Sequence, residues 1–232
     1  MFNNIAPTYD KLNHILSLNI DKIWRKKAVK RICKELRISG NQDFRNDAHV
    51  LDVACGTADS TIALAKAGIP FVTGIDISEG MIKIGEEKIA SLKIDNVSLK
   101  VDDSENLSFN DNSFNSAFIA FGIRNFEDKK KGLNELRRVL KDNGHLLILE
   151  LSVPQNFILL SLYKLYFLHI LPFIGKKISG DSNAYTYLPQ SVMNFPKPKE
   201  FMKMMEECGF KNVRQKALTF GLCRIYEGFV IS

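Results

Sequence analysis

The stretch Leu51-Asp-Val-Ala-Cys-Gly-Thr-Ala-Asp59 decides the fold of this chain. It ends an apolar run that begins at His49, and from Thr57 onward apolar residues recur at helical spacing. The small residues between these two patterns predict a tight turn from a strand into a helix. Such a turn lets the backbone approach a ligand closely, and the helix N-terminus offers free N–H groups. We therefore expect a ligand site at this turn.

Apolar runs typical of strands alternate with amphipathic stretches typical of helices over the next hundred or so residues. Nearly continuous apolar strands separated by helices predict a parallel sheet with helices on both faces. The expected strands are His49–Ala54, Phe71–Asp76, Val97–Asp102, Phe114–Phe121 and Gly144–Leu151. The expected helices between them are Thr57–Ala67, Gly80–Leu92 and Lys130–Leu140.

Both ends of the chain depart from this alternation. Lys197–Cys208 has the pattern of a helix, and two β-type runs follow it, Asn212–Thr219 and Leu222–Val230, separated only by Phe220-Gly221. This short separation predicts an antiparallel hairpin that closes the sheet. Near the N-terminus, Ile20–Leu36 predicts a helix outside the sheet.

The composition is that of an ordinary globular protein, with 45% apolar and 25% charged residues among 232. The net charge of +6 is spread along the chain, whereas a nucleic-acid-binding protein carries a dense basic stripe. The local basic runs, Lys26-Lys27 and Lys129–Lys131, are expected to be solvated helix faces. The excess charge favours a weak attraction to anionic membrane surfaces instead.

The cysteines and the N-terminus indicate a reducing compartment. Cys33, Cys55, Cys208 and Cys223 lie far apart with no Cys-x-x-Cys pair, which argues against a zinc site or a disulfide framework. The N-terminus has no basic-then-apolar leader, so no signal peptide is expected.

Polar residues follow the next two strands at the edge where the turn lies. Asp76 ends the second strand, 20 residues after Gly56, where an acidic side chain can accept both hydroxyls of a ribose. Asp103 and Ser104 follow the third strand, where a carboxylate and a backbone amide can bind an adenine edge. The alternative is that Gly56 only makes a turn and the aspartates only cap helices. Three strand ends in series favour a nucleotide-type ligand.

Charge and glycine content decide between the possible nucleotide ligands. A dinucleotide site requires Gly-x-Gly-x-x-Gly, and the matching positions are Ala54, Gly56 and Asp59, with one glycine of three. Asp52 and Asp59 flank the turn and are expected to repel a pyrophosphate. S-adenosylmethionine has no phosphate and carries a sulfonium and an ammonium group, which carboxylates attract. We therefore expect S-adenosylmethionine as the cofactor, and no metal.

The run from Asp52 to Ser104 resembles the class I methyltransferases, and the whole chain resembles the ubiquinone/menaquinone biosynthesis C-methyltransferases. The resemblance implies a single Rossmann-like α/β domain over residues 1–232, with a mostly parallel seven-stranded sheet, and cofactor contacts from Thr57, Asp76, Asp103 and Ser104. The matching stretches are Phe2-Asn-Asn-Ile-Ala-Pro-Thr-Tyr-Asp10, Asn13, Ser17, Trp24-Arg25, Phe121-Gly-Ile-Arg-Asn125, Arg138-Val-Leu-Lys141, Gly144, Glu150-Leu-Ser152 and Tyr185-Thr-Tyr-Leu-Pro189.

Three positions depart from that family's pattern. Ala58 replaces a usual glycine, which is expected to add a methyl group near the amino acid end of the cofactor. Asp142-Asn143 replaces a Pro-Gly turn far from the chemistry, and Asp21 replaces a histidine found in many members.

Carbon methylation of a quinol requires a phenolate next to the target carbon, and the resemblance supplies candidate residues. Arg124 is expected to stabilise that phenolate or to orient a water that accepts its proton, and Asn125 to hydrogen-bond the same oxygen. Tyr9 and Asp10 are further candidates, because residues 1–40 form a helical cap over the site in this family. The alternative for Arg124 is a structural ion pair with Asp128 or Glu127.

The most apolar stretch, Phe157–Ile174, falls within residues 153–190, which we expect to form a substrate lid. Lys164, His169 and Pro172 interrupt the stretch, so a membrane span is not expected. A plain core helix fits the periodicity equally well, and a polyprenyl substrate favours the lid. As a lid it would offer apolar surface to a bilayer or to a second subunit in a homodimer.

The expected function is methylation of demethylmenaquinol to menaquinol by a cytoplasmic enzyme bound peripherally to the inner face of the membrane, with no nucleic-acid partner. Alternatives are the ubiquinone-pathway methylation of 2-polyprenyl-6-methoxy-1,4-benzoquinol, methylation of another lipophilic molecule, or a scaffold without activity. The short chain and the stretch Ala184-Tyr-Thr-Tyr-Leu-Pro189 favour the menaquinone pathway.

Overall fold

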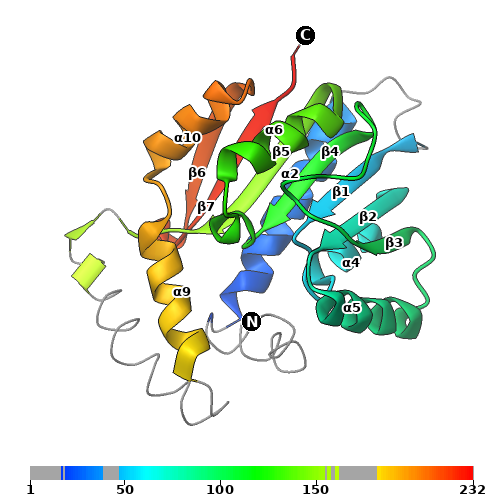
Figure 1. Ribbon diagram of the computed structural model, residues 1–232, viewed down its shortest axis with the longest axis horizontal. Helices are drawn as coiled ribbons and strands as arrows, with labels where there is room; N and C mark the ends of the chain where they lie inside the picture. Colours follow the sequence, from blue (N-terminus) through cyan, green and yellow to red (C-terminus); the bar gives the residue numbers. More distant parts are fainter. Residues whose placement is uncertain are drawn as a thin grey trace.

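A computed structural model describes residues 17, 19–38, 47–154, 156, 157, 160, 161 and 182–231. These residues build a seven-stranded sheet in the order β3-β2-β1-β4-β5-β7-β6 (Figure 1). The strands are β1 (His49–Val53), β2 (Phe71–Asp76), β3 (Val97–Val101), β4 (Phe114–Ala120), β5 (Leu140–Leu151), β6 (Lys211–Leu218) and β7 (Cys223–Phe229). The helices are α2 (Ile20–Ile38), α4 (Asp59–Lys66), α5 (Glu79–Leu92), η1 (Ile123–Asn125), α6 (Lys129–Val139), α9 (Ser182–Asn194), α10 (Pro198–Glu207) and η3 (Thr219–Gly221).

The pairing of the strands confirms the expected mostly parallel sheet. Strands β1 to β5 pair in parallel, and β7 lies antiparallel between β5 and β6. The C-terminal hairpin therefore completes the sheet, as its short connection predicted. The carboxyl ends of the first four strands meet at one edge, which we call the ligand edge.

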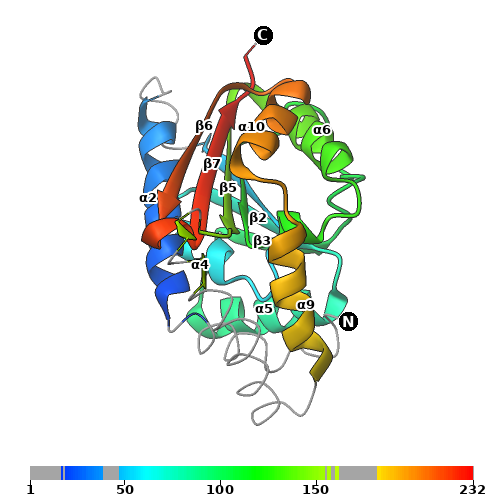
Figure 2. The same ribbon diagram turned by 90° about the vertical axis from the view of Figure 1, so that its left-hand side faces the viewer.

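Two apolar cores lie on opposite faces of this sheet, because successive residues of a strand point to opposite sides. Leu146 and Ile148 face the core that α6 and α10 cover. Leu147 and Leu149 face the core that α2 and α4 cover, where Trp24 of α2 is buried. Figure 2 shows the sheet edge-on between these two helical layers.

Strand β5 begins four residues before the expected Gly144. Leu140 already pairs with Phe114 of β4, and the register shifts after that pair. Asn143 then has a φ of 60°, a left-handed conformation that asparagine tolerates, and its N–H donates to the Val230 carbonyl at 2.9 Å. The turn at Asp142-Asn143 therefore lies inside β5, where it makes the pairing with β4 irregular.

Several expected segments fall outside the described residues. These are the N-terminal residues that include Tyr9 and Asp10, and most of the expected lid helix Phe157–Ile174. The expected N-terminal helix forms as α2 and packs on the face of the sheet. Of the described helices, none is both long enough and apolar enough to cross a membrane.

Candidate functional site

The turn after β1 has three alternate residues in the left-handed backbone region. They are Ala54 (φ 54°), Gly56 (φ 56°) and Ala58 (φ 68°). This conformation costs a residue with a Cβ atom roughly 1–2 kcal/mol, and such strain gathers at ligand sites. The Cys55 N–H donates to the Ile75 carbonyl at 2.9 Å, which holds the turn against β2. Backbone strain is therefore concentrated where β1 meets the ligand edge.

Asp76, at the end of β2, is anchored to this turn by the backbone. Its Oδ2 accepts the Gly56 N–H at 2.9 Å, and its Oδ1 accepts the Ser78 N–H at 2.8 Å. Burial raises the pKa of Asp76, although the two backbone hydrogen bonds oppose this rise. Each carboxylate oxygen has a second lone pair, so Asp76 can still accept two hydroxyl groups from a ligand.

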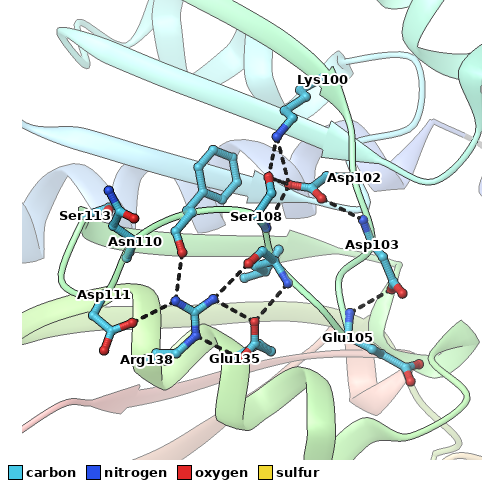
Figure 3. Close-up of polar contacts among 12 residues, drawn as sticks. Lys100, Asp102, Asp103, Glu105, Ser108, Asn110, Asp111, Ser113, Glu135 and Arg138 are labelled. Carbon is cyan, nitrogen blue, oxygen red and sulfur yellow. Dashed lines mark hydrogen bonds and ion pairs between the residues drawn. The ribbon is translucent and has the colours of Figure 1, made fainter.

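The loop after β3 carries Asp103 and Ser104 and folds back on itself (Figure 3). Asp103 Oδ1 accepts the Glu105 N–H at 2.8 Å, which forms a tight local turn. Asp102 Oδ2 accepts the Ser108 hydroxyl at 2.5 Å, which closes a wider one. These hydrogen bonds fix the wall of the site within the loop itself.

Arg138 of α6 holds this loop against the helix, as Figure 3 shows. Its guanidinium donates to the carbonyls of Leu107 and Phe109 at 2.9 and 2.7 Å and to Asp111 at 2.8 Å. The remaining two N–H groups form a bidentate pair with Glu135 at 2.9 and 2.7 Å. All five donors of the guanidinium are therefore used to fix residues 107–111 against α6.

A pocket of about 350 Å³ opens at the ligand edge between these elements, a size within the range of small-molecule sites. Among the described residues that line it, four carry a carboxylate and none is a lysine or an arginine. Such a pocket attracts a cation and repels phosphate, which fits the sulfonium and ammonium groups of S-adenosylmethionine. The lining residues are Ala54, Gly56, Asp76, Ile77, Met81, Asp103, Ser104, Glu105, Ala120, Phe121, Gly122, Asn125, Phe126 and Glu127.

The two aspartates on which the charge argument rested do not face this pocket. Asp52 is fully buried, and its Oδ2 accepts the Thr61 hydroxyl at 2.6 Å. Asp59 forms ion pairs with Lys88 at 2.8 Å and Arg25 at 3.3 Å. The acidic character that selects the cofactor comes instead from Asp76, Asp103 and two glutamates that sequence reasoning missed. Those glutamates, Glu105 and Glu127, lie in loops, where the spacing of charges gives no signal.

Most of the expected cofactor residues meet in the pocket. Gly56, Asp76, Asp103 and Ser104 line it together. Thr57 is not among the lining residues, because its side chain is buried and its hydroxyl accepts a hydrogen bond from Lys88 at 3.0 Å.

Ala58, whose methyl group was expected near the amino acid end of the cofactor, is not among the residues that line the pocket. The residue is fully buried, and a Cβ built on Gly85 of α5 would lie 3.1 Å from the Ala58 Cβ. The methyl group therefore packs between α4 and α5, against a glycine that leaves room for it.

Arg124 and Asn125 occupy η1, directly after β4. Asn125 lines the pocket, whereas the Arg124 side chain is 7% exposed and forms an ion pair with Glu150 at 2.8 Å. The partner is thus neither Asp128 nor Glu127, and Asp128 instead caps α6 by accepting the N–H groups of Lys130 and Lys131. Arg124 therefore forms a buried ion pair, with a carboxylate other than the two expected.

Glu150 is the third residue near this site that sequence reasoning missed. It is fully buried at the end of β5 and accepts the backbone N–H groups of Arg124 and Leu151 at 3.2 and 2.8 Å in addition to the ion pair. One carboxylate near the end of the expected strand Gly144–Leu151 was the available signal. Tyr9, the third expected catalytic residue, lies outside the described residues.

Comparison with known proteins fits this geometry. The profile of the ubiE/COQ5 methyltransferase family matches residues 1–230. The chain belongs to this family. It is therefore an S-adenosylmethionine-dependent methyltransferase, as the turn and the acidic pocket led us to expect.

Full-length relatives within the family share about two fifths of their residues with this chain. A protein of Bacteroides fragilis named demethylmenaquinone methyltransferase is 42% identical over 228 residues, which cover 97% of this chain and 89% of the relative. A protein of Geobacter sulfurreducens named ubiquinone/menaquinone biosynthesis C-methyltransferase is 41% identical, covering 98% and 86%.

Solved structures support the fold at lower identity. An Aquifex aeolicus SAM-dependent methyltransferase superposes with a TM-score of 0.59 and 19% identity, covering 88% of this chain and 89% of that one. At this identity the likeness concerns the fold alone.

Proposed function

We propose that this enzyme methylates a ring carbon of a prenylated quinol and converts demethylmenaquinol to menaquinol. The observation that carries the proposal is the acidic pocket at the ligand edge, which Phe121 and Asn125 line. The Arg124 guanidinium donates a hydrogen bond to the carbonyl of Phe121. The name of the Bacteroides fragilis relative, which matches along nearly the full chain, supports the choice of quinol.

Gly56, Asp76, Asp103 and Ser104 are the residues proposed to hold the cofactor. Bound there, S-adenosylmethionine supplies the electrophilic methyl group. Asp76 accepts the ribose hydroxyls, and the loop fixed by Arg138 presents Asp103 and Ser104 to the adenine. The pocket carboxylates lower the energy of the cationic donor relative to water and exclude phosphate-bearing nucleotides.

Asn125 and Arg124 are proposed to act on the quinol. The Asn125 amide can donate a hydrogen bond to the phenolate oxygen beside the target carbon. Arg124 keeps a positive charge next to that oxygen at any working pH, because a guanidinium does not lose its proton. Glu150 fixes the plane of the guanidinium through the ion pair and the Arg124 backbone N–H. Stabilised phenolate character makes the ring carbon nucleophilic.

A prenylated quinol resides in a bilayer, so we also propose that the enzyme works at the inner face of the membrane as a peripheral protein. The segment 153–190 is proposed to form the lid over the quinol. The net charge of +6 supports attraction to anionic lipid.

The ubiquinone-pathway methylation is the second candidate, because the Geobacter sulfurreducens relative carries a name that includes both quinones. The direct experiment offers the purified enzyme S-adenosylmethionine with short-chain demethylmenaquinol or with the corresponding 6-methoxybenzoquinol, under reducing conditions. We expect a ring-methylated product by mass spectrometry from the first quinol at a much higher rate. Transfer to the second alone would assign the ubiquinone pathway, and transfer to neither would refute the proposal.

A test of the proposed role of Arg124 requires a variant that leaves no unpaired buried charge. Arg124→Ala would leave Glu150 unpaired, a loss that commonly costs about 3–5 kcal/mol of stability. The double variant Arg124→Met with Glu150→Gln removes both charges, so it should fold and bind cofactor normally while turnover falls by about 10²–10³. Normal turnover in that double variant would remove Arg124 from the chemistry. Arg124→Lys should keep only part of the activity, since an ammonium cannot replace the planar guanidinium.

A further inference from the structure

The turn between β6 and β7 holds a bulky side chain in solvent on a strained backbone. Thr219, Phe220 and Gly221 have φ values of 44°, 56° and 91°. Hairpin turns of this hand normally use asparagine or glycine, and the conformation disfavours a β-branched or aromatic residue. The Phe220 side chain is nevertheless 80% exposed. Strain and an exposed aromatic ring both lower the stability of the isolated molecule, which points to a function for this turn.

Hydrogen bonds hold the turn in this conformation from two sides. The Trp24 indole N–H donates to the Thr219 hydroxyl at 2.7 Å, and the Ser152 hydroxyl donates to the Gly221 carbonyl. Trp24 belongs to α2 and is itself buried in the core between α2 and the sheet. The position of Phe220 is therefore set by the packed body of the protein.

The solvent side of α2 beside this turn carries an uncompensated line of lysines. Lys22, Lys26, Lys30 and Lys34 follow at four-residue spacing, with Lys27 next to them, and all five are exposed. Like charges at this spacing destabilise a helix. Within the described part of the chain no carboxylate pairs with them, because Asp21 lies buried beside Arg25 and Glu35 binds Arg214. Ile23, in the same line, is 55% exposed.

The turn and the lysine-bearing helix α2 lie side by side on one surface of the protein. The hydrogen bond between Trp24 and Thr219 joins them, and Figure 2 shows η3 beside α2. The Trp24 ring also lies 6.3 Å from the ring of Phe121, which lines the pocket. We call this surface the docking face and define it by Lys22, Ile23, Lys26, Lys30 and Phe220.

We propose that the docking face binds the surface of an anionic phospholipid bilayer, with the lysines on the headgroups and Phe220 and Ile23 among the upper acyl chains. Adjacent basic and apolar side chains on one face are what interfacial binding requires. A nucleic acid would satisfy the lysines but would offer no apolar phase to Phe220 and Ile23. The inference rests on the proposed membrane-peripheral function and deepens it by naming the surface that meets the bilayer.

Flotation of the full chain with vesicles tests the docking face. The probes are vesicles of phosphatidylcholine with phosphatidylglycerol, and vesicles of phosphatidylcholine alone. We expect the wild type to bind the anionic vesicles at low salt. The triple variant Lys22→Gln, Lys26→Gln and Lys30→Gln should lower that binding by roughly tenfold or more. Phe220→Ser should remove mainly the binding that persists at high salt, where charges are screened.

Matched controls lie elsewhere on the molecule. Phe71→Ser changes an aromatic residue that is 52% exposed at the start of β2, away from the ligand edge. Lys83→Gln, Lys131→Gln and Lys199→Gln together remove the same charge from α5, α6 and α10. Both controls should bind vesicles as the wild type does. Phe220→Gly relieves the strain while deleting the ring, so it separates loss of binding from loss of folding.

The outcomes are distinct from those of the function test. Absence of wild-type binding at low salt, or equal losses in the controls, would overturn the docking face. If DNA displaces the vesicles, and Phe220→Ser binds DNA as tightly as the wild type does, the face binds nucleic acid instead. If the wild type forms a dimer that the Phe220→Ser substitution dissociates, and does not bind vesicles, the docking face binds a second copy of the chain.

Turnover separates the docking face from the proposed reaction. Turnover of a short-chain quinol in solution should be unchanged in the docking variants, whereas turnover of a long-chain quinol in vesicles should fall. Vesicle binding without turnover of any quinol would refute the reaction and leave the docking face standing. Equal turnover of vesicle-borne quinol by the docking variants and the wild type would overturn the docking face and leave the reaction standing.

Discussion

Asp52 lies within β1, just before the strained turn, and its side chain is fully buried. Burial raises the pKa of Asp52 to about 7, although the hydrogen bond from Thr61 and the charge of Arg25 oppose the rise. A carboxyl whose pKa is raised in the folded state favours folding when protonated. Its contribution is complete below the ordinary pKa of an aspartate and is lost as the pH rises through about 7.

We expect Asp52→Asn to gain stability relative to the wild type as the pH rises. Asparagine stays neutral and keeps an oxygen for the Thr61 hydroxyl, so it avoids the cost of a buried charge. Between about pH 5 and about pH 8.5 the difference in unfolding free energy should change by on the order of 1–3 kcal/mol in favour of the variant. Thermal unfolding of both proteins across this range measures it. A difference that does not depend on pH would show that Asp52 does not titrate in the folded protein.

Asp76 gives a prediction for cofactor affinity. Because both carboxylate oxygens accept backbone N–H groups, Asp76→Asn must turn its amide towards the N–H of Gly56 or Ser78. We therefore expect the asparagine variant to bind S-adenosylhomocysteine nearly as poorly as Asp76→Ala does. For both variants the binding free energy should be about 2–4 kcal/mol less favourable than for the wild type. Calorimetry measures both. Asp103→Asn is the control, since Asp103 holds the Glu105 N–H with one oxygen and can keep that bond as asparagine. Wild-type affinity in Asp76→Asn would contradict the prediction.

At this scale the sequence predicts which residue types gather at the ligand edge better than where each side chain points. Asp76, Asp103 and Ser104 line the pocket together, because the ends of neighbouring parallel strands fix their positions. Thr57 and Ala58 do not line the pocket, because the Thr57 hydroxyl accepts a hydrogen bond from Lys88 of α5 and the Ala58 side chain is fully buried. Contacts of this kind join residues that are distant in sequence, so the residue types do not reveal them.

Among the elements, the loop after β3 depends on a residue of α6 that never reaches the pocket. Arg138→Lys leaves one ammonium, with three donors, where a guanidinium served five acceptors. We expect the loop to loosen and the affinity for S-adenosylhomocysteine to fall about tenfold, equivalent to ~1.4 kcal/mol. Discrimination against the inosine analogue of this ligand should fall as well, because Asp103 and Ser104 would no longer be held against the base.

Titration with both ligands distinguishes a loosened loop from general destabilisation. Loss of folded protein lowers binding of the two ligands equally and leaves their ratio unchanged. Lys130→Gln is the matched control on the same helix, where the side chain is exposed and pairs with Glu207. It should leave both affinities and the ratio at the wild-type values. An unchanged ratio in Arg138→Lys would limit Arg138 to a structural role.

Helices and strands were largely predictable, because alternating apolar runs and helical spacing are local signals. The expected β3 and β7 differ from the observed strands only by terminal residues. The early start of β5 could not be predicted, since it depends on pairing between Leu140 and Phe114, which are distant in sequence. The hydrogen bonds from Arg138 to residues 107–111 could not be predicted for the same reason.

Across the whole molecule, one buried carboxylate connects α2 with three strands. Glu227 of β7 is 1% exposed. It forms ion pairs with Arg31 of α2 and Arg214 of β6 and a hydrogen bond with His145 of β5. Although burial opposes it, the hydrogen bonds from these three partners lower the pKa of Glu227 to about 2. A depressed carboxyl pKa stabilises the fold above the ordinary pKa of a glutamate, and this contribution is lost as the pH falls towards about 2.

Glu227→Gln should therefore lower the free energy of unfolding at neutral pH by about 2–4 kcal/mol, because the guanidinium groups of Arg31 and Arg214 lose their counter-charge. The gap between variant and wild type should narrow below about pH 4.5, where the unfolded wild type begins to bind a proton. Denaturant unfolding at several pH values measures both effects. Glu207→Gln, at an exposed ion pair on α10, should leave the unfolding midpoint unchanged. A constant gap down to the lowest pH would refute the assigned role of Glu227.

The position of β7 between β5 and β6 also has a consequence for synthesis on the ribosome. The contacts that bury α2 join residues at opposite ends of the chain, such as Trp24 with Thr219 and Glu35 with Arg214, 195 and 179 residues apart. Until β7 emerges, β5 has an open edge and α2 lacks its ion pair with Glu227. Such distant pairings slow folding and leave apolar strands exposed to aggregation in the meantime. In the nascent chain, α2 can therefore complete its packing only after β7 has been synthesised.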